Sequence, residues 1–527
     1  MSKPSLLPLA LFASLCAFAL ETPALADVTP AVPFQSHAVL QQGRALPVWG
    51  TADAGEKVTV TYAVGTTTRT ASATAGTDGR WRTELPSLAA SAEAATLTFA
   101  GKNTVTLTDI LVGEVWLASG QSNMEWALGW GDRVINAKAE IAAAGFPLIR
   151  EIKIKPAAAD APQTSAPGSW RPCSPATVGN FSAAAYFFAR DLHQKLNVPV
   201  GILNASWGGS LIEPFMTPAS LAADPNGPAI LGKWQEKTAA YPANKARYDG
   251  ELAAWRAAKA NAEKAGEKFT AKAPSLPPGP GHQATPSGSY NAMIHPLVPY
   301  AVRGVIWYQG ESNAGRHVEY RTFFPSLIAG WRAAFNQPDL PFYWVQLAAY
   351  GANGDPDGVG FAWLRDAQDR TLSVPRTGQA LAIDIGDSGN IHPGNKQDVG
   401  RRLARLALHR TYGQTEVVDS GPVLSKAELA AGAPGLVRLH FANVAAGLKN
   451  THPASPGAVL GFEVAGEDKV FRPAAARIEN PNTGIVVLAA PDSVPAPAYV
   501  RYAFRNDPKN TLANSEGLPA APFRTDP

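Results

Sequence analysis

The middle of the chain, residues 109–415, alternates apolar strand candidates with helical patterns. The strand candidates are Leu111–Ala118, Val200–Asn204, Gly304–Tyr308, Phe342–Leu347 and Ala380–Ile385, and the helical stretches are Ala183–Lys195, Tyr320–Ala334 and Gln397–Tyr412. Strands that alternate with helices are joined by crossovers, which place them parallel in one sheet with helices on both faces. The sequence therefore predicts an α/β core.

Polar and glycine-containing segments follow four of these strand candidates. They are Ser119–Met124, Asn204–Ser210, Trp307–Asn313 and Asp384–Pro393. In an open parallel sheet, ligands bind beyond the carboxyl ends of the strands. Each segment alone is typical of a turn or of a buried polar group. At successive strand ends they can supply a hydroxyl nucleophile, an imidazole base and oxyanion donors, which indicates a hydrolase.

The same segments resemble a known family. Gly120–Met124, Ser206–Gly209, Trp307–Ser312 and Ile391–Pro393 are similar to the motif blocks of the sialate O-acetylesterases, carbohydrate esterases of the SGNH hydrolase superfamily. The likeness extends to both flanks, at Val39–Gln42, Pro47–Gly50, Asn514–Pro519 and Pro522–Thr525. The resemblance implies a flavodoxin-like three-layer core and metal-free hydrolysis of an acetyl ester.

The resemblance implies Ser122 as the nucleophile and His392 as the general base. Gly120 lets the chain leave the strand sharply, so a helix is expected to begin near Ser122, where developing negative charge is favoured. Ser119 is expected to close the strand and to hydrogen-bond locally. His295 also stands in an Ile-His-Pro triplet, but it precedes the third strand and is expected at the opposite edge of the sheet.

The resemblance also implies the donors to the oxyanion. They are the backbone N–H of Ser122, a backbone N–H of Gly208 or Gly209, and the side-chain amide of Gln309. An amide side chain can donate two hydrogen bonds without adding charge, which suits a transient oxyanion. Further residues beside the motifs are expected to contact substrate: Trp126, Trp130, Trp207 and Asn313.

The third member of the triad is open. Many superfamily members carry an aspartate three residues before the histidine, but here that position is Gly389. Three alternatives remain: Glu311, which we prefer, Asp387, or no acid at all, with a backbone carbonyl orienting His392.

The flanks of the core have a different pattern. Residues 27–108 and 416–527 carry short strand-like runs between turns, which predicts two small β-sandwiches or two parts of one. Residues 217–289 interrupt the core with an Ala/Lys/Glu-rich stretch followed by a Pro-rich one. An apolar stripe at Tyr248, Leu252 and Trp255 favours a helical hairpin or arm, either for packing or as a rim over the substrate cleft.

Residues 1–26 have the features of a cleavable signal peptide. Lys3 precedes the apolar run Leu6–Leu20, and Ala24–Ala26 is a small-residue cleavage site. We therefore expect export to the periplasm or the cell exterior, without a membrane span. Cys173 is the only cysteine after this segment, so no internal disulfide forms and a buried, inert thiol is expected.

The net charge and the absence of certain motifs limit the classes of ligand and cofactor that we expect. The chain has 46 Lys and Arg against 43 Asp and Glu, and a net charge of +3 does not suggest a nucleic-acid partner. No zinc-protease motif, paired CxxC or phosphate-binding glycine loop is present, so no cofactor is expected. The expected binding partner is an acetylated carbohydrate. No sequence feature indicates an oligomeric state, and we assume a monomer.

These observations favour a serine-dependent carbohydrate O-acetylesterase. Its acetylated substrate is a sialic acid, as the family name suggests, or a hemicellulose such as xylan or xyloglucan. Two other classes compete with it. One is a non-catalytic glycan-binding protein on a degenerate scaffold, which the complete set of Ser, Gly, Gln and His disfavours. The other is a lipase, which would need an apolar channel where the motifs have polar and aromatic neighbours.

Overall fold

The computed structural model describes residues 27–351, 355, 357–429, 435–452 and 457–527, so the predicted signal peptide lies outside the described residues. Its centre is a sheet in which every neighbouring pair from β9 to β14 is parallel and β10 is antiparallel at the edge. The order is β10 (Trp170–Pro172), β9 (Ile149–Lys153), β11 (Val200–Ser206), β8 (Thr104–Gly120), β12 (Gly304–Tyr308), β13 (Phe342–Val345) and β14 (Thr377–Ala380). The predicted α/β class is confirmed.

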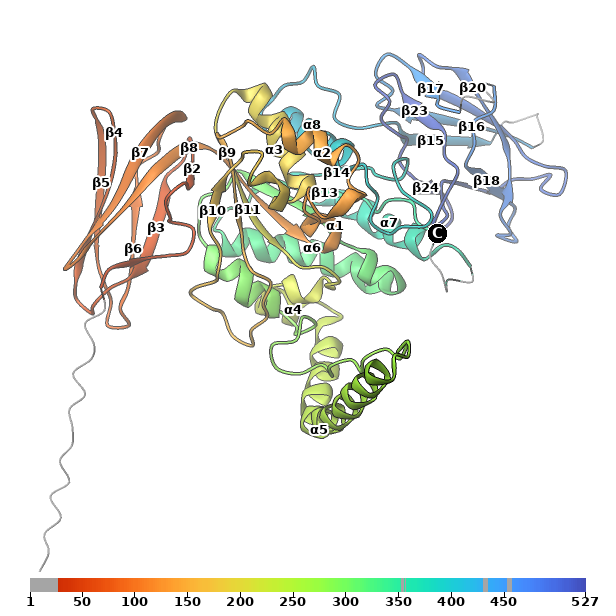
Figure 1. Cartoon of the computed structure of the whole chain (residues 1–527). Coiled ribbons are helices and arrows are strands. Elements are labelled where there is room, and N and C mark those ends of the chain that lie inside the picture. The colour runs from red at the N-terminus through yellow and green to blue at the C-terminus, as the bar shows by residue number, and fades with distance from the viewer. Residues whose placement is uncertain (1–26, 352–354, 356, 430–434, 453–456) are drawn as a thin grey trace, which may run out of the picture.

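Helices cover both faces of this sheet (Figure 1). On one face α3 (Ala183–Leu196) packs against α8 (Lys396–Arg410), and on the other α6 (His317–Ala334) packs against α7 (Gly360–Arg370). Each face has its own apolar cluster, because strand side chains alternate between faces: Trp116 belongs to one cluster and Trp307 to the other. Short helices complete the core: α1 (Ser122–Glu125), α2 (Ala137–Ala142), η1 (Gly131–Arg133), η2 (Val178–Asn180), η3 (Glu213–Phe215), η4 (Tyr290–Ile294), η5 (His295–Leu297), η6 (Glu311–Arg316) and η7 (Thr371–Ser373).

The long strand β8 connects the core to the N-terminal strands. Its first half pairs antiparallel with β7 (Ser91–Ala100), and its second half pairs with β11 and β12. The predicted boundary between residues 108 and 109 therefore falls inside one strand. The other N-terminal strands are β1 (Thr29–Pro30), β2 (Val39–Gln41), β3 (Leu46–Thr51), β4 (Lys57–Val64), β5 (Thr67–Thr74) and β6 (Arg80–Leu85).

The C-terminal strands lie on the opposite side of the core from the N-terminal ones (Figure 1). They are β15 (Val423–Leu429), β16 (Leu436–Ala442), β17 (Leu448–Asn450), β18 (Phe462–Ala465), β19 (Arg472–Pro473), β20 (Ala475–Asn480), β21 (Ile485–Ala489), β22 (Tyr499–Tyr502), β23 (Leu512–Asn514) and β24 (Phe523–Arg524). The buried Arg365 of α7 holds this region against the core, since its guanidinium donates to the carbonyls of Leu347, Ala348, Arg505 and Asn506.

The last core strand lies earlier in the chain than expected. We expected a strand over Ala380–Ile385, whereas β14 ends at Ala380. The residues that follow are still buried, but for another reason: Ile383 packs in the apolar cluster of the C-terminal region, and the carbonyl of Leu381 accepts from Arg402. An apolar run covered by a neighbouring region cannot be told from a strand by hydrophobicity alone.

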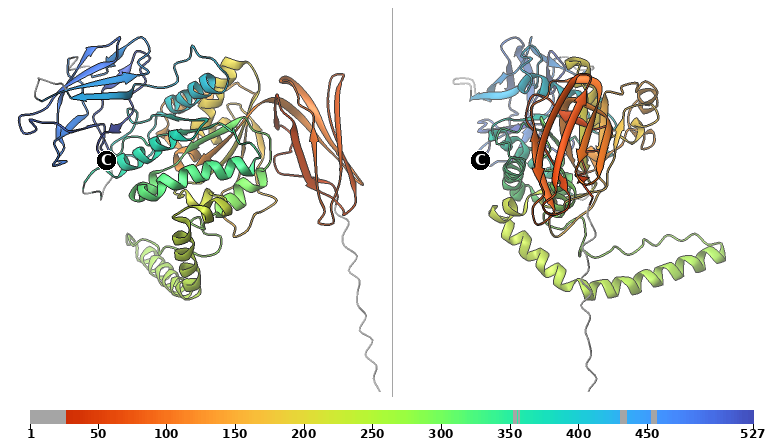
Figure 2. Two further views of the ribbon diagram at one scale, coloured as in Figure 1. Left: turned by 180° about the vertical axis from the view of Figure 1, so that it is seen from behind. Right: turned by 90° about the vertical axis from the view of Figure 1, so that its left-hand side faces the viewer.

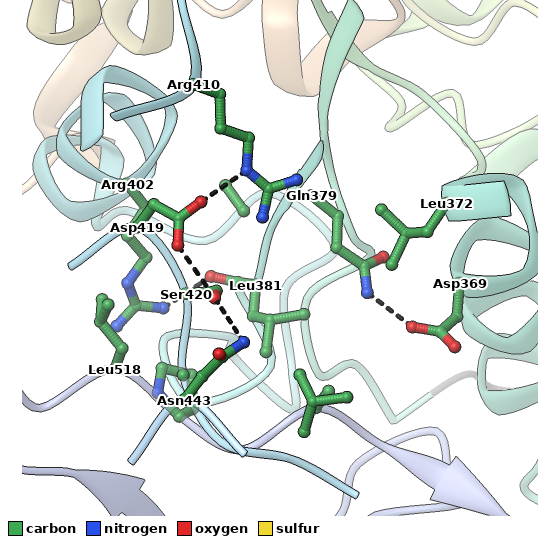
Figure 3. Close-up of a pocket in the computed structure, with 15 residues that line it drawn as sticks. Asp369, Leu372, Gln379, Leu381, Arg402, Arg410, Asp419, Ser420, Asn443 and Leu518 are labelled. Carbon is green, nitrogen blue, oxygen red and sulfur yellow. Dashed lines mark hydrogen bonds and ion pairs between the residues drawn. The ribbon is translucent and has the colours of Figure 1, made fainter. Parts of the chain in front are cut away.

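A cavity of about 320 Å³ lies at this joint between β14, α8 and the C-terminal region (Figure 3). Polar pairs line it: Gln379 donates to Asp369 at 2.7 Å and Arg410 to Asp419 at 2.5 Å. It contains none of the residues that the sequence predicts for catalysis. The joint is thus held by hydrogen bonds as well as by apolar contact.

Residues 217–289 begin with α4 (Pro218–Ala223), which packs against α6, and α5 (Gly227–Ala265) then extends away from the core as a projecting arm (Figure 2). α5 is one bent helix with Pro242 inside it. The chain then returns along α5 without regular structure, over residues 267–280, which we call the strap. The structure thus contains a single helix and this strap in place of the helical hairpin that we considered. Trp255 of the predicted stripe packs on the strap: its indole lies edge-on to Phe269 and donates to the carbonyl of Ala271 at 2.8 Å.

Two further sequence predictions concern the Cys173 thiol and membrane-spanning helices. Cys173 is buried, as predicted, and burial raises the pKa of its thiol to about 11, which keeps it protonated and unreactive. Among the described residues, the helices are too short or too polar for any of them to cross a bilayer.

Candidate active site

The loop after β8 presents Ser122 at the edge of the sheet. Gly120 ends β8 with φ of +132°, and a Cβ atom there would lie 2.2 Å from the carbonyl oxygen of Tyr308. Only glycine fits this close approach to β12. Ser119 just before it is buried and donates to the carbonyl of Ala205 at 2.5 Å, as expected of a residue that closes the strand.

Ser122 and His392, which are 270 positions apart, meet at hydrogen-bond distance. The Nε2 atom of His392 lies 2.8 Å from the Oγ atom of Ser122. His392 comes from the loop before α8, and its backbone N–H donates to the side chain of Asn390 at 2.9 Å. The ring of Trp126 covers the imidazole, with 4.6 Å between ring centroids. This is the geometry of a hydroxyl and its general base. His295 has no part in it, because its Nδ1 is bound to the carbonyl of Gln163.

The surroundings of His392 favour its neutral form. Partial burial lowers the pKa of the imidazole, and the positive charges of Lys396 and Arg133 lower it further. A neutral imidazole can accept the proton of a serine hydroxyl.

The loop after β11 lies against Ser122. A Cβ atom on Gly208 would be 3.4 Å from the Cβ of Ser122. The backbone N–H of Gly208 donates to the Glu125 carboxylate at 2.7 Å, so it is already occupied. The backbone N–H groups of Ser122 and Gly209 have no acceptor within the described part of the chain. Of the two glycines that the sequence left open, Gly209 is therefore the one whose backbone N–H is free to donate in the described part of the chain.

The Gln309 amide is engaged inside the protein. Gln309 is fully buried, and its Nε2 donates to Asn313 at 2.7 Å and to the carbonyl of Ser210 at 3.2 Å. Its oxygen accepts from Tyr320 at 3.1 Å. In this arrangement neither amide hydrogen is free for an oxyanion, in contrast to our expectation. Gln309 instead holds the loop after β11 next to the loop after β12.

Asn313, which we expected at the substrate, is buried as well. It is 1% exposed, accepts from the backbone N–H of Ile212 at 3.0 Å and donates to Glu213 at 3.2 Å. Its hydrogen-bonding groups are thus satisfied by protein partners. Trp207 is partly buried against the core, and its backbone N–H donates to the carbonyl of Gly120 at 3.0 Å. Of the four residues that we predicted to contact substrate, Trp126 lies beside the serine–histidine pair and Trp130 packs on Trp126.

Neither candidate acid hydrogen-bonds to His392. Glu311 accepts from the side chain of Asn123 at 2.5 Å, and its buried Oε2 atom has no hydrogen-bond partner among the residues that the structure describes. Asp387 is exposed and accepts from the backbone N–H of Gly389 at 2.9 Å. Across the described residues neither a carboxylate nor a backbone carbonyl is hydrogen-bonded to the imidazole, so the third member of the triad stays a prediction.

Comparison with known proteins finds related carbohydrate esterases. A family model described as "carbohydrate esterase, sialic acid-specific acetylesterase" matches residues 283–409, which include His392. The sialate O-acetylesterase of Rattus norvegicus is 31% identical over 418 residues, which cover 73% of each chain. That of Mus musculus is 31% identical over 365 residues, 64% of this chain and 63% of its own. A crystal structure of a carbohydrate acetylesterase from Xanthomonas citri is 36% identical with a TM-score of 0.77, and the match covers 95% of this chain and 99% of that one.

The chain belongs to the sialate O-acetylesterase family. It is therefore a carboxylic ester hydrolase, and the family that its motifs indicated is confirmed. Within the described residues of this esterase, no group of three or more His, Cys, Asp or Glu side chains is placed to hold a metal ion.

Two residues of the site in this member of the sialate O-acetylesterase family were not predicted from the sequence. Asn123 directly follows Ser122 and is 1% exposed, and Lys396, the first residue of α8, stands four positions after His392 and is equally buried. The Lys396 ammonium donates to the Oδ1 atom of Asn123 at 2.6 Å. The position of Asn123 inside a motif was a usable signal, whereas a single lysine at a helix start reads as solvent-exposed.

Proposed function

We propose that this esterase removes acetyl groups from sugar hydroxyls, with Ser122 as the nucleophile and His392 as the general base. The single observation that carries this proposal is the 2.8 Å contact between Ser122 Oγ and His392 Nε2, formed by residues from opposite ends of the core. It lies beyond the carboxyl ends of β8 and β12, where ligands bind in open parallel sheets.

The reaction follows from these positions. His392 takes the proton of Ser122 as the oxygen attacks the acetyl carbonyl, and the negative charge that develops is accepted by the backbone N–H groups of Ser122 and Gly209. His392 then returns the proton to the sugar oxygen, which leaves as a hydroxyl. His392 then takes a proton from a water that attacks the acyl-serine, and it returns this proton to the Ser122 oxygen as the acyl–oxygen bond breaks and acetate leaves.

The strand order supports assigning the core to the flavodoxin-like SGNH hydrolases. Read across the sheet, the strands are β11, β8, β12, β13 and β14. Numbered by their order in the chain, this is 2-1-3-4-5, the flavodoxin order, with β9 and the edge strand β10 added beside β11. The order reverses between β8 and β12, and Ser122 follows the first of these strands. The site therefore stands at the topological switch point.

The lowered pKa of His392 gives a pH prediction. The active form is the neutral imidazole, so a pKa below the ordinary value of 6.5 extends activity to more acidic solution. We expect the acid limb of kcat for p-nitrophenyl acetate to have its midpoint below pH 6.5. The measurement is kcat from about pH 5 to pH 8, with re-assay at neutral pH to exclude acid unfolding. A midpoint at or above 6.5 would contradict the proposed environment of His392.

An aromatic pair beside His392 is a suitable platform for a sugar ring. Trp130 packs edge-on to Trp126 at 5.6 Å and is 43% exposed. Lys153 and Arg133 lie over the two rings, at 5.0 Å from Trp130 and 5.2 Å from Trp126. An exposed indole so close to the base can stack on the sugar that carries the acetyl group.

We expect Trp130→Ala to raise KM for an acetylated oligosaccharide about 5–10-fold, the loss of roughly 1 kcal/mol of stacking. KM for p-nitrophenyl acetate should stay unchanged, because that ester has no sugar to stack. The matched control is Trp255→Ala in the projecting arm. Equal KM values in both variants and wild type would remove Trp130 from the substrate site.

Acetate release from O-acetylated sialic acid, acetylated xylan and acetylated xyloglucan, measured side by side, tests the proposed function. We expect release from at least one of them and incorporation of a phosphonate ester at Ser122, detected by peptide mass spectrometry. Hydrolysis of p-nitrophenyl acetate without release from any acetylated sugar would contradict the carbohydrate substrate. Labelling at another serine would contradict the nucleophile.

A further inference from the structure

Two buried, oppositely charged side chains lie behind Ser122 and His392, and one amide joins them. Lys396 at the start of α8 donates to Asn123 Oδ1 at 2.6 Å. Asn123 Nδ2 donates to Glu311 Oε1 at 2.5 Å and to the carbonyl of Ile391 at 3.0 Å. Asn123 is the neighbour of Ser122, and Ile391 is the neighbour of His392. One side chain therefore ties the nucleophile loop, the loop after β12 and the histidine loop together.

Both charges have few other partners. Among the described residues, the Lys396 ammonium donates to one acceptor, Asn123, and otherwise faces the ring of Tyr308, 5.3 Å away. The Oε2 atom of Glu311 is buried without a partner. Burying two charges costs free energy that such limited contacts do not recover, and an apolar pair of the same size is often at least as stable. Stability alone is thus a poor explanation for them.

We propose that Lys396 is a positioning residue that acts through Asn123 on the Ser122–His392 pair, with Glu311 as its buried counter-charge. This proposal rests on the proposed function. An ammonium can only donate, so it fixes the amide oxygen of Asn123 toward α8. Both amide hydrogens then face Glu311 and Ile391, which sets the separation of the serine and histidine loops. Glu311 would serve catalysis through Asn123 rather than as a triad acid.

The charge of Lys396 also reaches the imidazole. The charged groups around His392 are Lys396 from α8 and Arg133 from η1, both of which lower its pKa. On the other side of Ser122, the Glu125 carboxylate is bound to Gly208. Burial lowers the pKa of Lys396 to about 7, against the opposing effect of Glu311, so the ammonium is charged over the acidic range in which His392 titrates. Removing this charge should therefore raise the pKa of His392.

The test compares Lys396→Met, the double variant Lys396→Met/Glu311→Gln and Ser122→Ala, all in the full-length chain with p-nitrophenyl acetate. For Lys396→Met we expect kcat to fall about 10–100-fold with KM within about twofold, because positioning acts on the transition state. We also expect the acid limb of kcat to move to higher pH. The double variant removes both charges, so it should recover the melting temperature while its acid limb stays displaced.

Each outcome decides between a positioning and a structural role. The proposal is wrong if either folded variant keeps the wild-type kcat and the wild-type acid limb. It is also wrong if the double variant recovers the melting temperature, kcat and the acid limb together. If Lys396→Met does not fold, the double variant carries the same comparison. An inactive Ser122→Ala beside a wild-type-like Lys396→Met would overturn this proposal alone, whereas a fully active Ser122→Ala would overturn the proposed function as well.

Discussion

Ser122→Ala is expected to lower kcat for p-nitrophenyl acetate by at least about 10³-fold, with residual activity from the oxyanion donors. The reason is geometric: among the described residues, the Oγ atom of Ser122 is the one hydroxyl that hydrogen-bonds to His392, at 2.8 Å. The backbone N–H groups of Ser122 and Gly209 stay in place without it. The measurement is steady-state hydrolysis together with acetate release, on protein with a wild-type melting temperature.

The matched control is Ser119→Ala, three residues earlier in the same motif. Ser119 is fully buried and its hydroxyl donates to the carbonyl of Ala205, so its removal should cost about 1 kcal/mol of stability and leave kcat within a few-fold of wild type. Loss of activity in Ser119→Ala with retention in Ser122→Ala would exchange the roles of the two serines.

Gly120→Ala is expected to disrupt both the fold and the site. A Cβ atom at this position would lie 2.2 Å from the carbonyl oxygen of Tyr308, and φ of +132° is strained for alanine. Together these cost about 2–4 kcal/mol. We expect a melting temperature at least about 5 °C lower. In the protein that still folds, we expect kcat to fall about 10²-fold, since separating β8 from β12 displaces Ser122.

Gly145→Ala is the control for this substitution. Gly145 has no atom within 4 Å of the position that a Cβ would take, and its φ is not positive. Its melting temperature and kcat should therefore match wild type. A Gly120→Ala protein with wild-type stability would show that the close approach of β8 and β12 is dispensable.

Several elements could be predicted because a local pattern encodes them. The helices near Ala183, Tyr320 and Lys396 and the strands β8, β11 and β12 carry strong periodicity or continuous apolar runs, and the structure contains all of them. β9 was missed, since its sequence Ile-Arg-Glu-Ile-Lys looks solvent-exposed. The charged side chains of Arg150 and Glu151 are instead hydrogen-bonded inside the fold. Arg150 donates to Asp109 at 2.8 Å, and Glu151 accepts from Asn204 at 3.2 Å.

The sequence by itself determined the α/β class, the family and the segments that hold the serine, the histidine and the glycines, because these depend on local pattern and on motif order. Only the tertiary structure decided which groups are free to act. In the structure, the amides of Gln309 and Asn313 hydrogen-bond to other residues of the protein. Glu311 makes no hydrogen bond to His392, and Lys396 is buried. The physical reason is that a polar side chain's role depends on its hydrogen-bond partners and burial, and these are contributed by residues distant in the chain.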